Sequence, residues 1–210
     1  MIVLPSKARQ SKPMHLLYLH GFRSSPDSFK ARQLKAWLDA HRPDVVWWCP
    51  QLPPSPRQAW ALVEQGIAHW PHAAGDTAVV GSSLGGFYAT AVAEARACRA
   101  MLLNPATDPA RDLARYVGEQ TQFHTPEERF LFRAEYLAEL RELTVRTITD
   151  PGRYGALIAK GDELLDWREM TGRYPGLPAA NLRLLEGSDH AISDFDDHLL
   201  FILQFLKLCD

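Results

Sequence analysis

Three side chains that can together catalyse acyl transfer stand at Ser83, Asp162 and His190. Ser83 lies at the centre of the stretch 81–85, Gly-Ser-Ser-Leu-Gly, which matches the pattern G-x-S-x-G. In this pattern the serine occupies a sharp, strained turn between a strand and a helix, so its neighbours two residues away must be very small. The two glycines meet this requirement. A chain of this length contains the pattern by chance roughly 7% of the time, so a Gly-rich turn without chemistry is the alternative.

A carboxylate and a histidine follow two later apolar runs of the chain. Asp162 comes directly after one such run, and His190 comes after the last one. Because ligands bind at the carboxyl ends of the strands in an open parallel sheet, both side chains are expected near Ser83. A histidine there can take the serine proton as a general base, and a carboxylate can orient that histidine. Glu163 and Asp166 are competing acids, and capping of the next helix is an alternative or additional role for Asp162.

Two backbone N–H groups are expected to hold the oxyanion of an acyl-transfer reaction. Leu84 opens the helix after Ser83, where free N–H groups and the helix dipole favour negative charge. Phe22 follows the first apolar run, and its N–H is the expected second donor. The imidazole of His20 is expected to fix this loop through hydrogen bonds, and Ser82 is expected to face the protein interior and not the substrate.

The order serine, aspartate, histidine is that of the α/β-hydrolase triad and differs from the orders of the two well-known serine protease types. Such a triad predicts a two-step acyl transfer through an acyl-enzyme. A metal site is a rival interpretation, and its residues would be Asp189, His190, Asp194, Asp196, Asp197 and His198. Their spacing fits no tight set of ligands, and the three acids at 194–197 more simply favour the N-terminus of the final helix.

Short apolar runs alternate with helical patterns along the chain. The runs lie at 15–20, 45–49, 76–80, 100–103, 156–159 and 181–185. Helices are predicted at 27–41, 55–70, 87–96, 164–174 and 194–208. This alternation predicts the α/β class, with about six strands in a mainly parallel sheet and helices on both faces.

Residues 107–148 interrupt this alternation with a long, charged insert. A capping box over 125–128, with proline at the first helical position, predicts a helix from Pro126 to about Leu143. Such an insert is typical of a small helical lid. Its aromatic residues are expected either to line an acyl pocket or, more simply, to pack on the body; they are Tyr116, Phe123, Phe130, Phe132 and Tyr136. Its arginines are expected on a solvated face, where one could serve an anionic leaving group; they are Arg111, Arg115, Arg129 and Arg133.

The whole chain has the properties of one ordinary globular domain. Its 210 residues allow a real core, expected at 14–106 and 150–210 with a flexible lead-in at 1–13. A charged share of 23% and a net charge of −2 indicate no nucleic-acid partner, and no apolar stretch is long enough for a membrane span. Three widely spaced cysteines, Cys49, Cys98 and Cys209, are expected to be reduced thiols, as in the cytoplasm. The oligomeric state stays open between a monomer and a weak homodimer.

Five short motifs resemble those of the small bacterial esterases of the YqiA type, which belong to the α/β-hydrolase superfamily. The motifs lie at 18–26 (Tyr-Leu-His-Gly-Phe with Ser-Ser-Pro), 81–86 (Gly-Ser-Ser-Leu-Gly-Gly), 104–106 (Asn-Pro-Ala), 161–166 (Gly-Asp-Glu-Leu-Leu-Asp) and 187–191 (Gly-Ser-Asp-His-Ala). The resemblance runs from about Met14 to the end of the chain, and the insert departs from it most.

This resemblance implies a compact hydrolase that acts on small carboxylic esters or thioesters without a metal or an organic cofactor. Ser83 would be the nucleophile, Asp162 the acid and His190 the base, and the N–H groups of Phe22 and Leu84 would form the oxyanion hole. We therefore expect a serine esterase for short to medium acyl chains. The alternatives are an acyl-CoA thioesterase or a peptidase on the same triad, or a non-catalytic binding protein on this fold.

Overall fold

The computed structural model of the protein describes residues 14–71, 75–123, 125 and 127–209. The lead-in expected at residues 1–13 lies outside this part of the chain. No helix among the described residues is both long and apolar enough to cross a bilayer.

In the described part of the chain, six parallel strands form the main sheet in the order β2-β1-β3-β4-β7-β8. Their bounds are β1 His15–Leu19, β2 Val46–Trp48, β3 Thr77–Ser82, β4 Arg99–Leu103, β7 Tyr154–Ala159 and β8 Leu182–Leu185. The chain passes from β1 to the edge strand β2 and then returns to the other side of β1 as β3. The direction of winding therefore reverses between β1 and β3, which is the place where open α/β sheets bind ligands.

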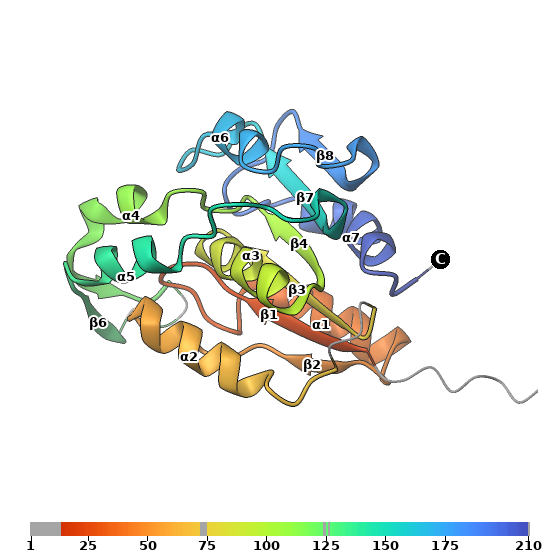
Figure 1. Ribbon diagram of the computed structural model, residues 1–210, viewed down its shortest axis with the longest axis horizontal. Coiled ribbons are helices and arrows are strands. Elements are labelled where there is room, and N and C mark those ends of the chain that lie inside the picture. Colours follow the sequence, from red (N-terminus) through yellow and green to blue (C-terminus); the bar gives the residue numbers. More distant parts are fainter. Residues whose placement is uncertain (1–13, 72–74, 124, 126, 210) are drawn as a thin grey trace, which may run out of the picture.

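Helices cover both faces of this sheet (Figure 1). Successive residues of a strand point to opposite faces, so Leu17 and Leu19 of β1 belong to one core cluster, while Leu16 and Tyr18 belong to the other. The cluster of Leu17 includes side chains of α2 (Pro56–Gly66), α3 (Leu84–Arg96), α5 (Tyr136–Leu143) and α6 (Trp167–Gly172). The cluster of Leu16 includes side chains of α1 (Phe29–His41) and α7 (Leu199–Phe205). Both faces are buried, which explains the continuous apolar runs.

Several predicted helices are shorter in the structure than in the sequence pattern. The helix expected to reach residue 70 ends at Gly66, where a Cβ atom would lie 1.9 Å from the ring of Trp48. The helix expected from residue 164 begins at Trp167, because Asp166 accepts a hydrogen bond from the N–H of Arg168 as its N-cap. Short 3₁₀ turns lie at Ala114–Tyr116, Pro151–Arg153, Ala179–Asn181 and Phe195–His198.

The helix predicted from Pro126 to Leu143 is wrong in its first half. The short helix α4 (Pro109–Asp112) opens the insert, and β5 (Gly118–Thr121) then pairs antiparallel with β6 (Arg129–Phe132). Among the described residues of the predicted range, only α5, which begins at Tyr136, is helical. In β6, residues 129 and 131 are exposed while Phe132 is buried and Phe130 half-buried. This two-residue alternation of packed aromatic rings favours a strand, and it overrides the local helix-start signal.

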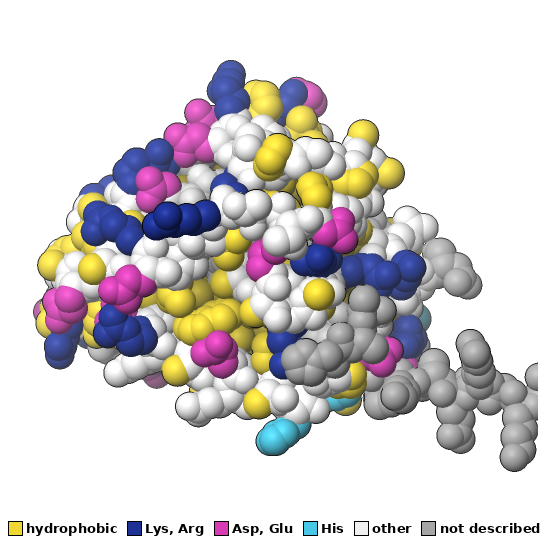
Figure 2. Space-filling model, in the orientation of Figure 1, with side chains coloured by type: hydrophobic (Ala, Val, Ile, Leu, Met, Phe, Trp, Pro, Cys, Tyr) yellow, Lys and Arg dark blue, Asp and Glu magenta, His cyan; other side chains and the backbone are white. Residues whose placement is uncertain are grey.

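The insert is fastened to the body near the start of α2. In Figure 1, α4, α5 and β6 lie together on the left, beside the first turn of α2. The buried carboxylate of Glu139 in α5 accepts hydrogen bonds from the hydroxyl of Ser55 at 2.7 Å and from the N–H of Arg57 at 3.0 Å. Figure 2 shows side chains of both charges interspersed over α4 and α5.

Candidate active site

The turn between β3 and α3 holds Ser83 in a conformation that non-glycine residues rarely adopt. Its backbone angles are φ 56° and ψ −121°, and a non-glycine residue in such a region costs about 1–3 kcal/mol. Three hydrogen bonds fix this conformation. The N–H of Ser83 donates to the carbonyl of Leu103 at 3.0 Å, and the carbonyl of Ser83 accepts from the N–H groups of Gly86 at 2.8 Å and Ala106 at 3.0 Å. The serine side chain is thereby held at the apex of the turn.

The glycines on either side of this serine are required by close packing. A Cβ atom on Gly85 would lie 1.9 Å from the carbonyl oxygen of Leu19 in β1, and one on Gly81 would lie 2.3 Å from the carbonyl oxygen of Gly85. Contacts this short are prohibited for any side chain that cannot move. The small neighbours predicted from the sequence pattern therefore let α3 begin directly against the sheet.

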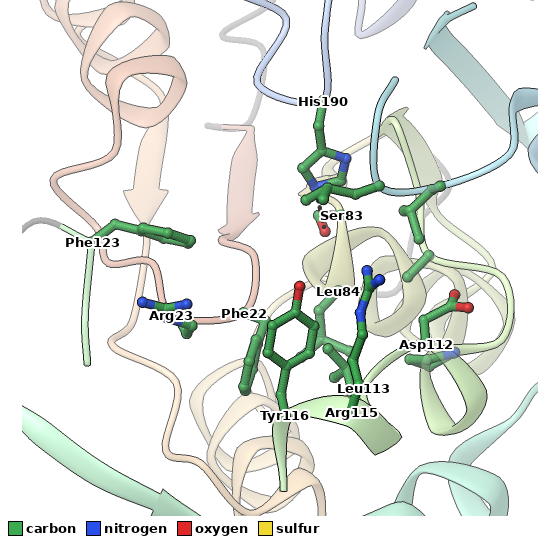
Figure 3. A pocket seen from close by; sticks show the side chains of 14 residues that line it. Phe22, Arg23, Ser83, Leu84, Asp112, Leu113, Arg115, Tyr116, Phe123 and His190 are labelled. Carbon is green, nitrogen blue, oxygen red and sulfur yellow. Dashed lines mark hydrogen bonds between the residues drawn. The ribbon is translucent and has the colours of Figure 1, made fainter. Parts of the chain in front are cut away.

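The side chains of Ser83, His190 and Asp162 form a continuous chain of hydrogen bonds, and Figure 3 shows Ser83 and His190 facing each other. The Oγ of Ser83 lies 3.0 Å from Nε2 of His190, and Nδ1 of His190 lies 2.7 Å from Oδ2 of Asp162. With the imidazole neutral, its Nδ1–H donates to the carboxylate, and Nε2 accepts from the serine hydroxyl. The Asp162 side chain is only 1% exposed and that of His190 is 18% exposed, so the carboxylate is shielded while the imidazole faces the cavity.

The two carboxylates that follow β7 have separate partners. The second oxygen of Asp162, Oδ1, accepts hydrogen bonds from the N–H groups of Leu164 and Leu165, both at 2.8 Å. Asp162 therefore orients the imidazole and also closes the turn that leads to α6. The carboxylate of Glu163, which competed with Asp162 on sequence grounds, accepts instead from the backbone N–H of His190 at 3.0 Å.

The side chain of Asn104 supports the loop that carries His190, and the sequence did not predict this role. Its side chain is fully buried, and its Nδ2 group donates to the carbonyls of Asp189 at 3.0 Å and His190 at 3.2 Å. Its Oδ1 accepts from the N–H of Ala159 at 2.8 Å, and its backbone has a positive φ of 42°. The asparagine directly after the β4 run was the only available signal. Asp189 forms a turn, because its carboxylate accepts from the N–H and the hydroxyl of Ser193.

The loop after β1 passes directly beside Ser83. A Cβ atom on Gly21 would lie 3.2 Å from the Cβ of Ser83, so only a glycine leaves this approach unobstructed. The next residue is Phe22, whose N–H has no hydrogen-bond acceptor in the part of the chain that the structure describes. Leu84 is the first residue of α3, so its N–H also has no partner within the helix. Both amides expected to hold an oxyanion therefore lie in segments that adjoin Ser83.

The hydrogen bonds of His20 confirm that its imidazole fixes this loop. The N–H of Leu52 donates to Nε2 of His20 at 3.1 Å, while Nδ1 lies 2.9 Å from the carbonyl of Gly21. Since Nε2 accepts, the neutral ring carries its proton on Nδ1 and donates to that carbonyl. The buried histidine thereby ties the loop before Phe22 to the segment after β2.

Two cavities open at Ser83 and His190. The smaller, of about 120 Å³, is mostly apolar, and Figure 3 shows Phe22, Leu84, Leu113 and Tyr116 around it. The larger, of about 440 Å³, is also lined mostly by apolar surface, from side chains such as Tyr18, Phe22 and Phe29. Lys30 and the hydroxyls of Ser24, Ser28, Ser82 and Ser193 add polar groups to this lining. Ser82 is buried, as expected, but it also borders this second cavity.

The insert contributes to these cavities in part. Among the five aromatic residues singled out above, Tyr116 and Phe123 line the smaller cavity. The rings of Phe130 and Phe132 instead pack on Phe22, with centroids 5.9 and 5.0 Å away, and support it from behind. The ring of Tyr136 lies against Phe132. Of the four arginines, Arg115 lines the cavity, whereas the other three form exposed ion pairs: Arg111 with Glu169, Arg129 with Glu119 and Arg133 with Glu135.

The acids near the final helix are engaged in local hydrogen bonds. Asp194 accepts from the hydroxyl of Ser188, and its carboxylate lies 3.1 Å from Nε2 of His198. Across the described residues, no three His, Cys, Asp or Glu side chains are grouped so that they could hold a metal ion. The rival metal-site interpretation therefore finds no ligand set in this part of the chain.

Comparison with protein families gives one match that spans nearly the whole chain. The family model described as "Uncharacterised protein family (UPF0227)" matches residues 15–207. That range includes every residue of the site described above.

Comparison with solved structures shows the fold. A hydrolase-type protein from Agrobacterium vitis S4 has a TM-score of 0.73 at 18% sequence identity, covering 92% of this chain and 88% of its own. The α/β hydrolase domain-containing protein 10 from mouse has a TM-score of 0.67 at 18% identity, covering 93% and 90%. A structure of metagenome-derived lipolytic enzymes, LipS and LipT, has a TM-score of 0.65 at 17% identity, covering 94% and 95%. The chain thus has the α/β-hydrolase fold, as the order of its motifs predicted.

Proposed function

The chain belongs to the UPF0227 family of YqiA-like proteins, and from this premise we propose that it is a serine hydrolase that cleaves carboxylic esters with short to medium acyl chains. The observation that carries the proposal is the unbroken hydrogen-bond chain from Ser83 through His190 to Asp162. It stands at the carboxyl end of the sheet, beside β1 and β3, between which the direction of winding reverses. The lipolytic activity of LipS and LipT, which share the fold, is consistent with this assignment.

In the first half of the reaction, Ser83 attacks the ester carbonyl while Nε2 of His190 takes its proton. The carbonyl oxygen becomes an oxyanion, which the N–H groups of Phe22 and Leu84 hold. Asp162 stabilises the imidazolium and keeps its orientation without taking a proton itself. As the tetrahedral intermediate collapses, the C–O bond to the alcohol breaks, and the alcohol leaves with the proton from His190.

In the second half, water replaces the alcohol. His190 takes a proton from the water as its oxygen attacks the acyl carbon, and a second oxyanion forms at the same two amides. The bond to Ser83 then breaks, and the serine oxygen recovers the proton from His190. The products are the alcohol and the carboxylic acid, and the protein returns to its starting state.

The smaller cavity supports the choice of acyl chain. Its mostly apolar lining suits a hydrocarbon chain, and its volume of about 120 Å³ has room for only a few carbons without movement of its walls. Tyr116 and Phe123 come from the 107–148 insert. In this proposal the insert belongs to the same domain as the sheet and forms one wall of the acyl site.

A thioesterase or a peptidase would use the same three side chains, so these activities are distinguished by comparing the rates on different substrates. The proposal is tested with 4-nitrophenyl esters of acyl chains from acetate to laurate, measured beside an acyl-CoA and a peptide substrate. We expect the highest kcat/KM for chains of two to about eight carbons, and thioester or peptide cleavage at least tenfold slower.

Two neighbouring serines provide a matched pair of variants for the nucleophile. Ser83→Ala should lower kcat by several orders of magnitude, because the attacking oxygen is lost. Ser82→Ala removes a hydroxyl one residue away and should retain at least a tenth of the activity. Loss of activity in Ser82→Ala but not in Ser83→Ala would contradict the assignment, and a wild-type protein without any hydrolytic activity would favour a non-catalytic binding role.

A further inference from the structure

The larger cavity at Ser83 has an ammonium and several hydroxyls in an otherwise apolar lining. It has a volume of about 440 Å³, within the range of small-molecule sites. Its walls include the loop that carries His190, through Ala191 and Ser193, and the start of α1, from its N-cap Ser28 to Lys30. A group bound in this cavity would therefore contact both the general base and the start of a helix.

The N-terminus of α1 is open to an anion. This helix has 13 residues, its N-cap Ser28 makes no side-chain capping hydrogen bond, and its first turn contains no acidic residue. The first N–H groups of a helix lack partners within it, and the helix dipole places partial positive charge at this end. Helix N-termini bind phosphate and carboxylate groups for these reasons.

A second positive group stands at the same place. The ammonium of Lys30 donates a hydrogen bond to the carbonyl of Ala191, directly after His190. An ammonium carries three donors, and this is the one acceptor found for it within the described residues. Burial lowers the pKa of Lys30 to about 8, against the opposing influence of Asp189 and Asp162, so most of its charge remains at neutral pH.

A buried hydroxyl on the wall of the cavity lacks a good partner. Tyr18 is completely buried, and neither its hydroxyl nor that of Ser28 makes a hydrogen bond of good geometry with any residue that the structure describes. Burial raises the pKa of Tyr18, and the nearby hydroxyls of Ser28 and Ser82 oppose this rise only in part. The phenol thus stays protonated and can donate, and leaving a buried hydroxyl without a partner is unfavourable. An acceptor oxygen at the floor of the cavity would relieve this cost.

His190 lines both cavities, so the size and walls of each cavity assign it to one half of an ester. The alcohol takes its proton from Nε2 of His190 as it leaves, and the larger cavity has room for an alcohol of more than a few carbons. The smaller cavity has a mostly apolar lining, to which Arg23, Asp112 and Arg115 also contribute, and its size suits a short acyl chain. The alcohol half is then the part of the substrate that meets Lys30 and the start of α1.

We propose that the leaving alcohol carries an anionic group, a carboxylate or a phosphate, which binds between the ammonium of Lys30 and the N-terminus of α1. This inference rests on the proposed ester hydrolysis and names its substrate class. As the bond from the acyl carbon to the ester oxygen breaks, that oxygen takes the proton from His190, and the anionic alcohol departs through the larger cavity.

Matched esters with one acyl group test this specificity. The substrates are 4-(carboxymethyl)phenyl butyrate, its neutral methyl ester, and 4-(phosphonomethyl)phenyl butyrate, in which a methylene separates the charge from the phenol. In the wild type, kcat/KM for at least one anionic ester should exceed that for the neutral ester about tenfold or more, as a charge-assisted hydrogen bond predicts. The carboxylate and phosphonate arms show which anion fits. A preference below about threefold for both would overturn the inference.

Variants of Lys30 are compared by the ratio of kcat/KM for the anionic ester to kcat/KM for the neutral ester. Any general effect on His190 acts on all three esters alike and cancels in this ratio. Lys30→Met should bring the ratio close to one, and Lys30→Arg, which keeps the charge, should retain most of it. An unchanged ratio in Lys30→Met would also overturn the inference.

Binding to Ser83→Ala separates this inference from the hydrolytic function. In this variant, 4-hydroxyphenylacetate or 4-hydroxybenzylphosphonate should bind at least about tenfold more tightly than methyl 4-hydroxyphenylacetate, measured by isothermal titration calorimetry. Equal binding of the neutral and anionic phenols would contradict the anion site. If the wild type cleaves 4-nitrophenyl butyrate but does not prefer the anionic esters over the neutral one, only this inference is overturned. If the wild type cleaves no ester, the proposed function is overturned, and the calorimetry still tests the anion site.

Discussion

Replacing Asn104 by aspartate should impair the site without removing any group that takes part in the reaction. Asn104→Asp keeps the size of the side chain and the oxygen that accepts from the N–H of Ala159. It replaces the Nδ2 group, which donates to the carbonyls of Asp189 and His190, by a second oxygen. Three oxygens would then face one another in a fully buried place, and the loop of His190 would lose its support.

The size of the effect follows from the two hydrogen bonds. Each contributes about 1 kcal/mol. The native conformation of the loop should therefore be destabilised by about 2 kcal/mol relative to displaced conformations. A change of 1.4 kcal/mol is a factor of ten in an equilibrium constant, which gives a shift of roughly 30-fold. We expect kcat/KM to fall by between about fivefold and 30-fold, and the free energy of unfolding to fall by about 2 kcal/mol.

A second asparagine provides the control. The Nδ2 group of Asn181 also donates to two carbonyls, those of Gly152 and Tyr154, but at the start of β7, the end of the strand away from the site. Asn181→Asp therefore makes the same chemical change and should leave kcat/KM for 4-nitrophenyl butyrate within about twofold. Urea unfolding reports the stability of both variants. Unchanged kcat/KM in a folded Asn104→Asp protein, or an equal loss in Asn181→Asp, would refute the positioning role.

Three further predictions concern the acid, the turn and the cation. Asp162→Asn should lower kcat/KM by about 10³–10⁴-fold while circular dichroism shows a folded protein, because the amide cannot stabilise the imidazolium and favours the wrong tautomer; a loss below tenfold would show that another acid serves His190. Gly85→Ala should prevent folding or lower the unfolding free energy by about 3 kcal/mol or more, since the added Cβ would lie 1.9 Å from a carbonyl oxygen of β1. The control is Gly172→Ala in α6, where no atom lies within 4 Å of the added Cβ, and it should change the unfolding free energy by less than about 1 kcal/mol. The preference for the carboxylate ester over its neutral methyl ester should decline as the pH rises through about 8, because Lys30 loses its proton there. Asp162 and Asp189 are the charged groups around this ammonium. A preference that stays constant from pH 7 to 9.5 would contradict the role of Lys30.

The sheet and the three side chains at its edge were predictable because each depends on short-range sequence patterns. Parallel strands buried on both faces are continuous apolar runs, and the residues that follow them share one edge of the sheet. Ser83, Asp162 and His190 each follow such a run, and the structure joins them by hydrogen bonds. The competing acids after β7 could not be separated in this way, because only the folded loops show that Glu163 meets a backbone N–H while Asp162 meets the imidazole.

Other features depend on contacts between distant segments, so the sequence did not reveal them. The strand β6 owes its form to packing of Phe130 and Phe132 on Phe22, more than a hundred residues earlier in the chain, and this contact outweighs a local helix signal. The support that Asn104 gives to the loop of His190 likewise joins segments 86 residues apart. The larger cavity arises where the start of α1, with Lys30, lies beside the loop of Ala191. None of these contacts between distant segments produces a periodic pattern in the sequence.

Covalent capture of Ser83 by a fluorophosphonate tests the central claim most directly. The reagent mimics an ester and forms a stable adduct only with a serine that a neighbouring base activates. We predict a single adduct on the intact protein, mapped by peptide mass spectrometry to Ser83, and at least a hundredfold slower labelling in Ser83→Ala and in His190→Ala. Absence of an adduct on Ser83 in the folded wild-type protein, or a principal adduct on Ser82, would contradict the account.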